Sequence, residues 1–115
     1  MIVPIATLHR VLALDLPGFG ASDKPLGTSY VFVFFERAIK GFLDALEVDR
    51  VGGAGHDLGG PIAVHWAFRH STRLIRMALL NTLLFPQFSD AVVEFVRTAM
   101  TPGLRERLTS WEGLE

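Results

Sequence analysis

The chain has 115 residues, half of them hydrophobic and a fifth of them charged, and its net charge is −1. A disordered chain is excluded, because low hydrophobicity would be needed to keep such a chain unfolded. The near-neutral charge provides no basic field for nucleic acid or for an anionic membrane surface. The absence of cysteine excludes disulfides, thiolate catalysis and cysteine-based zinc sites.

Segments that direct a protein to a membrane or out of the cell are not evident. No apolar run approaches the length of about eighteen residues that a membrane span needs. The first ten residues lack the basic region and the cleavage site of a secretory signal. The histidines, at positions 9, 56, 65 and 70, have no familiar metal-binding spacing. We therefore expect a cytoplasmic protein with no metal, no cofactor, no nucleic-acid partner and no membrane association.

The first two elements are a strand and a helix. The run Val11–Leu14 is apolar and is closed by a turn cluster, which predicts a buried strand. A helix is predicted from about Tyr30 to Glu47, because apolar residues recur there at steps of three and four. Its apolar face comprises Phe32, Phe35, Ile39, Phe42, Leu43 and Leu46. The charged residues expected mostly on the opposite face are Glu36, Arg37, Lys40 and Asp44.

Two further strands enclose a second helix. Val51–Gly55 is predicted as a strand from its context alone, since glycine weakens strand interiors. The helix Gly59–His70 begins at two glycines and a proline, and proline suits a first helical turn. The apolar run Met77–Leu80 predicts a third strand. From Leu83 onward the pattern contains helices only, the first at about Ser89–Met100.

This order of elements predicts an α/β fold. Strands separated by helices form parallel sheets through right-handed crossovers, and here the sheet is expected to have about three strands flanked by helices. Functional groups in such sheets lie beyond the carboxyl ends of the strands. Two loops meet that condition, one after Leu14 and the other after Gly55.

The second of these loops carries the main candidate for chemistry. It reads Gly55-His56-Asp57-Leu58-Gly59-Gly60, which has the form G-x-nucleophile-x-G. Small residues at both ends permit a sharp turn that presents the central side chain, Asp57, at the start of a helix. The helix dipole favours the ionised carboxylate, which can act as a covalent nucleophile without a base. The backbone N–H of Leu58 would supply half of an oxyanion hole.

The same residues allow other interpretations. Asp57 is also a good helix N-cap residue. The glycines from Gly53 to Gly59 loosely match a dinucleotide-binding fingerprint, but that fold needs an acid after the next strand, where this chain has Asn81. Asp15, after the first strand, is either a functional acid or, as we prefer, the residue that fixes the following loop.

Two motifs together carry a resemblance to a known family. Residues Val11–Pro25 resemble the strand-and-loop signature of α/β-hydrolase-fold enzymes, and Gly55–Gly60 resembles their nucleophile elbow in its aspartate form. That form occurs in epoxide hydrolases and in haloalkane and haloacetate dehalogenases. Residues Arg69–Thr82 also resemble a helix end and strand of the family. The resemblance implies a partial α/β-hydrolase core over residues 1–82 and the start of a helical cap over residues 83–115.

The resemblance also implies a mechanism. Asp57 would attack an epoxide or a carbon–halogen carbon of a small molecule and form an ester, with the N–H of Leu58 in the oxyanion hole. The structural residues of the elbow would be Gly55, His56, Gly59 and Gly60. At the position of Leu58 the dehalogenases of this family have a tryptophan that holds the halide, so the resemblance to haloalkane dehalogenases is weaker there.

Parts of the family machinery are not found in this chain. The family's His-Gly-x-Pro oxyanion loop precedes the segment that resembles this chain, and its catalytic acid and histidine follow it. We therefore expect ester formation without turnover. The alternative is a non-catalytic truncated homologue or an interaction module. Exposed apolar sheet edges further predict self-association.

Overall fold

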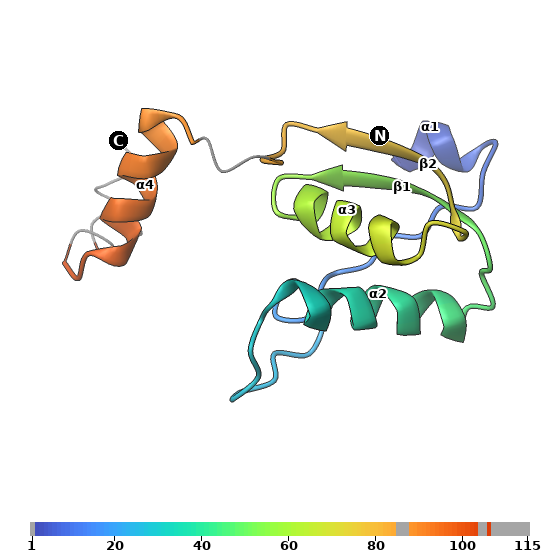
Figure 1. The fold of residues 1–115 in the computed structure, drawn as a ribbon, viewed down its shortest axis with the longest axis horizontal. Coiled ribbons are helices and arrows are strands. Elements are labelled where there is room, and N and C mark those ends of the chain that lie inside the picture. Colours follow the sequence, from blue (N-terminus) through green and yellow to red (C-terminus); the bar gives the residue numbers. More distant parts are fainter. Residues whose placement is uncertain (1, 85–87, 104–105, 107–115) are drawn as a thin grey trace. The chain divides into compact units, whose positions relative to one another are not determined.

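The computed structural model describes residues 2–84, 88–103 and 106 (Figure 1). The chain divides into two compact units, Met1–Thr82 and Leu83–Glu115, which are described separately. The elements in chain order are α1 (Ile2–Ala6), α2 (Phe32–Ala45), β1 (Val51–His56), α3 (Gly59–Arg69), β2 (Leu74–Leu80) and α4 (Asp90–Met100).

The sheet of the first unit is parallel, as predicted. β1 pairs with β2 in a register that runs from Gly52 opposite Arg76 to His56 opposite Leu80. The crossover between them is α3, which packs against both strands, and α2 packs against α3 (Figure 1). The carboxyl ends of β1 and β2 therefore lie at the same edge of the sheet, where the candidate elbow begins.

The core of this unit lies mainly between α2 and α3. Its buried apolar side chains are Phe35, Leu43, Ile62 and Trp66. Phe35 and Leu43 belong to the apolar face predicted for α2, and Ile62 and Trp66 lie on α3. Ile62 is 1% exposed, so α3 is held between α2 and the sheet by close packing.

The strand predicted at Val11–Leu14 is wrong, whereas those predicted at Val51–Gly55 and Met77–Leu80 are confirmed as β1 and β2. The described residues form a two-stranded sheet, and Val11–Leu14 is irregular chain without ladder partners among them. A strand is stabilised by hydrogen bonds to a neighbour. Here a cavity of about 170 Å³ is lined by Leu12 together with residues 51–54 of β1. Leu12 therefore lines the same cavity as β1 without pairing with that strand.

In the part of the chain that the structure describes, the face of the sheet turned away from α3 is uncovered. Alternate residues of β1, namely Gly52, Ala54 and His56, are exposed, and so are their partners Arg76, Ala78 and Leu80. Parallel sheets are normally covered on both faces. The face is therefore available for further contacts.

Arg73 ties the end of α2 to the start of β2. Its guanidinium donates to Asp44 Oδ1 at 2.6 Å, to the Val48 carbonyl at 2.7 Å and to the Asp49 carbonyl at 3.1 Å. A hydrogen bond from Lys40 and the bond from Arg73 lower the pKa of Asp44. These bonds fix the connection between α2 and β1.

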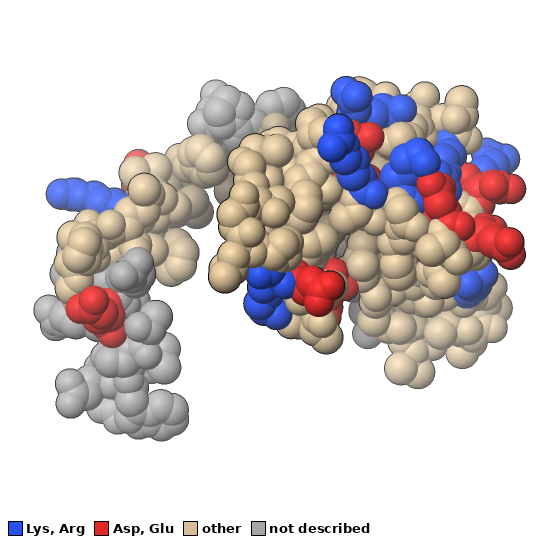
Figure 2. All heavy atoms as spheres, turned by 90° about the horizontal axis from the view of Figure 1, so that it is seen from below, with Lys and Arg blue, Asp and Glu red and all other residues tan. Residues whose placement is uncertain are grey.

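Acidic and basic side chains are interspersed over the face drawn in Figure 2, with wide neutral areas between them. This face has no field of a single charge. The pattern agrees with the near-neutral composition.

The second unit is described through α4. Ser89 caps this helix by accepting a hydrogen bond from the Val92 N–H at 3.4 Å, and Asp90 lies in its first turn. The helix agrees with the prediction for Ser89–Met100. Most of the remaining residues predicted as cap lie outside the described part. Among the described residues, no helix is long and apolar enough to cross a membrane.

Candidate active site

Asp57 lies in the turn between the end of β1 and the start of α3. Its φ angle is +49°, in the left-handed region, and its side chain is exposed. An L-residue pays about 1–2 kcal/mol for this conformation, although aspartate adopts it more readily than most. The turn must therefore be held by its surroundings.

Close packing of glycines holds the turn. A Cβ atom on Gly55 would lie 2.7 Å from the Cα atom of Gly60, and a Cβ atom on Gly60 would overlap the side chain of Thr82. The hydroxyl of Thr82, just beyond β2, donates to the Asp57 carbonyl at 2.5 Å. Contact therefore requires small residues at Gly55 and Gly60, whereas a Cβ atom on Gly59 would meet nothing within 4 Å.

The helix-capping interpretation of Asp57 is not supported. The cap position of α3 is occupied by Leu58, and no side-chain cap hydrogen bond is made there within the described residues. Asp57 contributes its carbonyl, which accepts from the Gly60 N–H at 3.1 Å. The carboxylate is left free of a capping role.

The loop after Leu14 is fixed by Asp15, as preferred from the sequence. The Ala21 N–H donates to Asp15 Oδ2 at 2.9 Å, and the Ser22 hydroxyl donates to the Asp15 carbonyl. Gly18 and Gly20 have φ angles of +93° and +48°, so the loop turns where glycine is favoured. The aspartate acts here as a structural residue.

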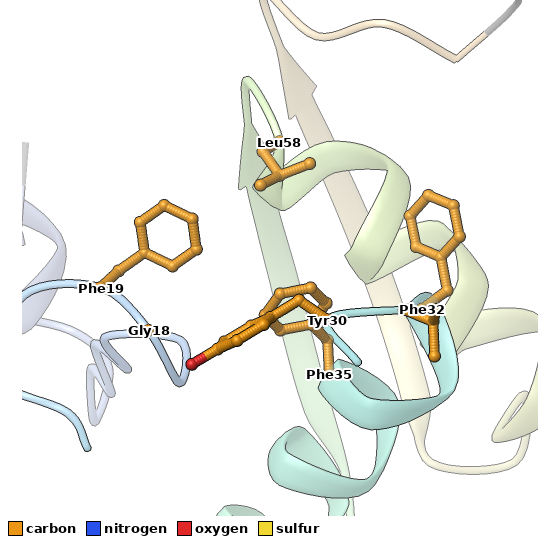
Figure 3. Close-up of a pocket in the computed structure, with 7 residues that line it drawn as sticks. Gly18, Phe19, Tyr30, Phe32, Phe35 and Leu58 are labelled. Carbon is orange, nitrogen blue, oxygen red and sulfur yellow. The ribbon is translucent and has the colours of Figure 1, made fainter. Parts of the chain in front are cut away.

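An apolar pocket of about 540 Å³ opens beside the elbow (Figure 3). It is lined by Gly18, Phe19, Tyr30, Val31, Phe32, Phe35 and Leu58. Leu58 reaches it from the turn before α3, and the aromatic residues come from the Asp15 loop and the start of α2 (Figure 3). The Tyr30 hydroxyl donates a hydrogen bond to the Pro25 carbonyl at 3.1 Å. The pocket therefore suits an apolar group.

Sequence reasoning did not find this pocket. Phe32 and Phe35 were assigned to the core, and only Phe35, at 4% exposure, is buried as a core residue would be. The sequence position of Phe19 could have indicated the pocket, because an aromatic residue between two turn glycines has no obvious place in a core.

A charge cluster lies between α2 and α3, and it corrects the placement of Glu36. This residue was predicted on the charged face of α2 but is buried, at 7% exposure. Its carboxylate bonds to His70 Nε2 at 2.8 Å and pairs with Arg69 Nε at 3.0 Å. His65 Nε2 lies 3.9 Å from the same carboxylate. α2 packs beside α3, so this position faces a neighbouring helix instead of solvent.

The pKa of Glu36 is lowered by the hydrogen bond with His70. Burial opposes this shift, and the charges of Arg69, His70 and His65 add to it. His65 and His70 therefore lie against the Glu36 carboxylate between the two helices. Within the described residues, no group of His, Asp and Glu side chains is arranged to hold a metal ion.

The chain belongs to the family described as "alpha/beta hydrolase fold", whose model matches residues 2–107. This match argues against the interpretation of the glycines from Gly53 to Gly59 as a dinucleotide-binding fingerprint.

Curated relatives include haloalkane dehalogenase 2 of Mycobacterium tuberculosis H37Rv, which is 34% identical over 102 residues. That alignment covers 89% of this chain and 36% of the relative. The 2-hydroxy-6-oxo-2,4-heptadienoate hydrolase of Pseudomonas putida F1 is 35% identical over 83 residues, or 71% of this chain and 30% of that protein.

A solved structure of similar fold is a variant meta-cleavage product hydrolase from Pseudomonas fluorescens IP01, in complex with acetates. It matches with a TM-score of 0.68 and 34% identity, over 70% of this chain and 30% of that one. The chain thus spans about a third of the length of the proteins it matches. These relatives are hydrolases that act on small molecules.

Proposed function

We propose that this chain forms part of a hydrolase in which Asp57 is the covalent nucleophile. The observation that carries the proposal is the turn itself, a strained aspartate between close-packed glycines, exposed at the carboxyl end of β1. Strained residues persist where the surrounding structure fixes them, and such residues cluster at active sites. The apolar pocket beside Leu58 would take the substrate.

The chemistry follows from the carboxylate. Asp57 attacks an electrophilic carbon and forms an ester bond to it, while the carbon–oxygen bond of an epoxide or the carbon–halogen bond breaks. The epoxide oxygen takes a proton from water, or the halide leaves as an anion. The backbone N–H of Leu58, the cap residue before α3, would stabilise the negative charge that develops.

The proposed substrate is an apolar epoxide or alkyl halide. The similarity to a haloalkane dehalogenase supports the carbon–halogen choice, and the aromatic pocket supports an apolar substituent. Leu58 supplies no ring N–H for a departing halide, which favours the epoxide. We assign residues 83–115 to the start of a helical cap region.

Hydrolysis of the ester needs a base that activates water. Two of the four histidines, His65 and His70, are engaged with Glu36 between the helices. His56 is the last residue of β1, on its uncovered face, and His9 lies just after α1. We therefore propose that the 115-residue chain forms the ester and does not release it.

The test is to incubate the chain with styrene oxide and, separately, with n-hexyl bromide, and to measure the mass of the peptide that carries Asp57. The expected result is an increase on that peptide by the full mass of the epoxide with styrene oxide, and by the mass of a hexyl group less one hydrogen with n-hexyl bromide. Asp57→Asn should abolish the increase, whereas the matched control Asp23→Asn, which changes another exposed carboxylate, should retain it.

Three outcomes would contradict the proposal. Absence of an adduct with both reagents rejects the nucleophile, and an adduct that persists in Asp57→Asn places the reaction elsewhere. Steady-state release of diol or alcohol by the chain alone, abolished in Asp57→Asn, rejects the expected arrest at the ester.

We also propose that the chain self-associates through the uncovered face of its sheet. Ala54, Ala78 and Leu80 give that face an apolar centre, and the exposed edges of a two-stranded sheet add unpaired backbone groups. Sedimentation of the chain should show a species larger than a monomer, and Ala78→Lys should restore the monomer. A monomer at all concentrations would reject this proposal.

A further inference from the structure

His65 connects the charge cluster between α2 and α3 to the wall of the apolar pocket. Its Nε2 atom is shielded from solvent, has no hydrogen-bond partner among the described residues and lies 3.9 Å from Glu36 Oε2. Its ring stacks on Phe32, with the centroids 5.6 Å apart and the planes at 24°. Phe32 in turn lines the pocket with Leu58 (Figure 3).

The position of Phe32 depends on such contacts because its own helix end is weakly fixed. Phe32 is the first residue of α2, and the cap residue Val31 makes no side-chain cap hydrogen bond. The first turn also contains no acidic side chain to complement the helix dipole. An uncapped helix start is stabilised by tertiary packing or not at all.

Glu36 is placed to orient His65. The carboxylate is one turn along α2 from Phe32, and the charged or titratable groups that act on it are His65, Arg69 and His70. His70 stacks on Trp66 in the core, with ring centroids 5.2 Å apart. Of the two histidines, His65 is the one whose ring stacks on a pocket residue.

We propose that His65 is a positioning residue for the apolar pocket. Attraction to Glu36 orients the imidazole, and the imidazole ring holds Phe32 in place as a wall of the pocket. The ligand class is a neutral apolar molecule, since the lining presents no charged side chain. The proposal rests on the proposed function only in taking this pocket as the substrate pocket.

The experiment measures binding of a neutral fluorescent dye, N-phenyl-1-naphthylamine, to the full 115-residue chain. It compares the wild type, Glu36→Gln, His65→Phe and the double variant. Glu36→Gln is expected to weaken dye binding at least about twofold in the wild-type background. A change of about twofold corresponds to the smallest interaction energies measured between residues in contact. In the His65→Phe background, where the ring remains but its link to Glu36 is gone, Glu36→Gln should have no effect.

His70→Gln provides the matched control background. Glu36→Gln should still weaken dye binding there, because His70 does not contact Phe32. The nuclear magnetic resonance shifts of the Phe32 ring give a second readout that does not depend on dye affinity. They should move in Glu36→Gln and stay fixed when the same change is made in His65→Phe.

If Glu36→Gln weakens dye binding equally in the wild-type and His65→Phe backgrounds, the proposal is overturned, because the carboxylate then acts on α2 without His65. No effect of Glu36→Gln on dye or ring shifts would overturn it too, as would failure of the wild type to bind the dye. These results leave Asp57 untouched, since the nucleophile is tested by a covalent adduct and not by dye binding.

Discussion

The hydroxyl of Thr82 donates a hydrogen bond to the carbonyl of Asp57 at 2.5 Å, across 25 residues of sequence. This bond joins the residue that follows β2 to the strained turn that follows β1. Gly60 fits against the same threonine side chain. The geometry of the elbow is thus fixed by the neighbouring strand end as well as by its own glycines.

Removal of this bond should loosen the turn. Thr82→Val keeps the shape of the side chain and removes the donor, so we expect the free energy of unfolding to fall by about 1 kcal/mol. Alkylation of Asp57 should slow in parallel, because the carboxylate is no longer held in one orientation. Thr82→Ser retains the hydroxyl and serves as the control. Equal alkylation rates in Thr82→Val and the wild type would show that the bond has no part in positioning Asp57.

Replacement of Gly59 and of Gly60, at the start of α3, by alanine should have different effects on the stability of the chain. Gly60→Ala places a methyl group in the space of the Thr82 side chain, and we expect destabilisation of about 1–3 kcal/mol. Gly59→Ala meets nothing within 4 Å and gains helix propensity, so its stability should be unchanged or higher. Urea unfolding of both variants measures the difference. A stable Gly60→Ala chain would contradict the packing described for the elbow.

The contribution of Glu36 to stability should depend on pH. Its pKa is lowered in the folded chain, first by the hydrogen bond with His70, so the folded state binds a proton less readily than the unfolded state does. The stabilisation is therefore complete above the ordinary glutamate value of 4.5 and is lost as the pH falls through the lower folded value. The stabilities of the wild type and Glu36→Gln should differ at about pH 7, and the difference should shrink as the pH falls below 4.5 and through the lower folded value. A difference that grows on acidification would contradict this assignment.

A methyl group at Gly53 should stabilise β1. A Cβ atom there would make ordinary contacts with Leu74 Cδ1 and Met77 Cε, both at 3.8 Å, and Gly53 does not have a positive φ angle. We expect Gly53→Ala to raise the free energy of unfolding by about 0.5–1 kcal/mol, because alanine restricts the unfolded chain. Gly55→Ala, which would press on the backbone of Gly60, should destabilise the same strand. Thermal unfolding compares the two, and a loss of stability in Gly53→Ala would refute the fit.

The sequence by itself determined α2, β1, α3 and β2 and the order in which they occur. The periodicity of α2 depends on neighbouring side chains that share one helix face, and the glycine spacing of the elbow depends on contacts within one turn. Both are local relationships, so they can be read along the chain. The loop role of Asp15 is local in the same way, because its partners Ala21 and Ser22 lie six and seven residues away.

The tertiary structure decided what depends on partners far apart in the chain. Val11–Leu14 has the composition of a strand, but a strand needs a neighbour in register, and this segment has no ladder partner among the described residues. Glutamate is usually found on the surface. Glu36 is buried here because Arg69 and His70, at the end of α3, lie against its carboxylate. Strand pairing and the compensation of a buried charge are both set by which elements pack together, and local sequence does not specify that packing.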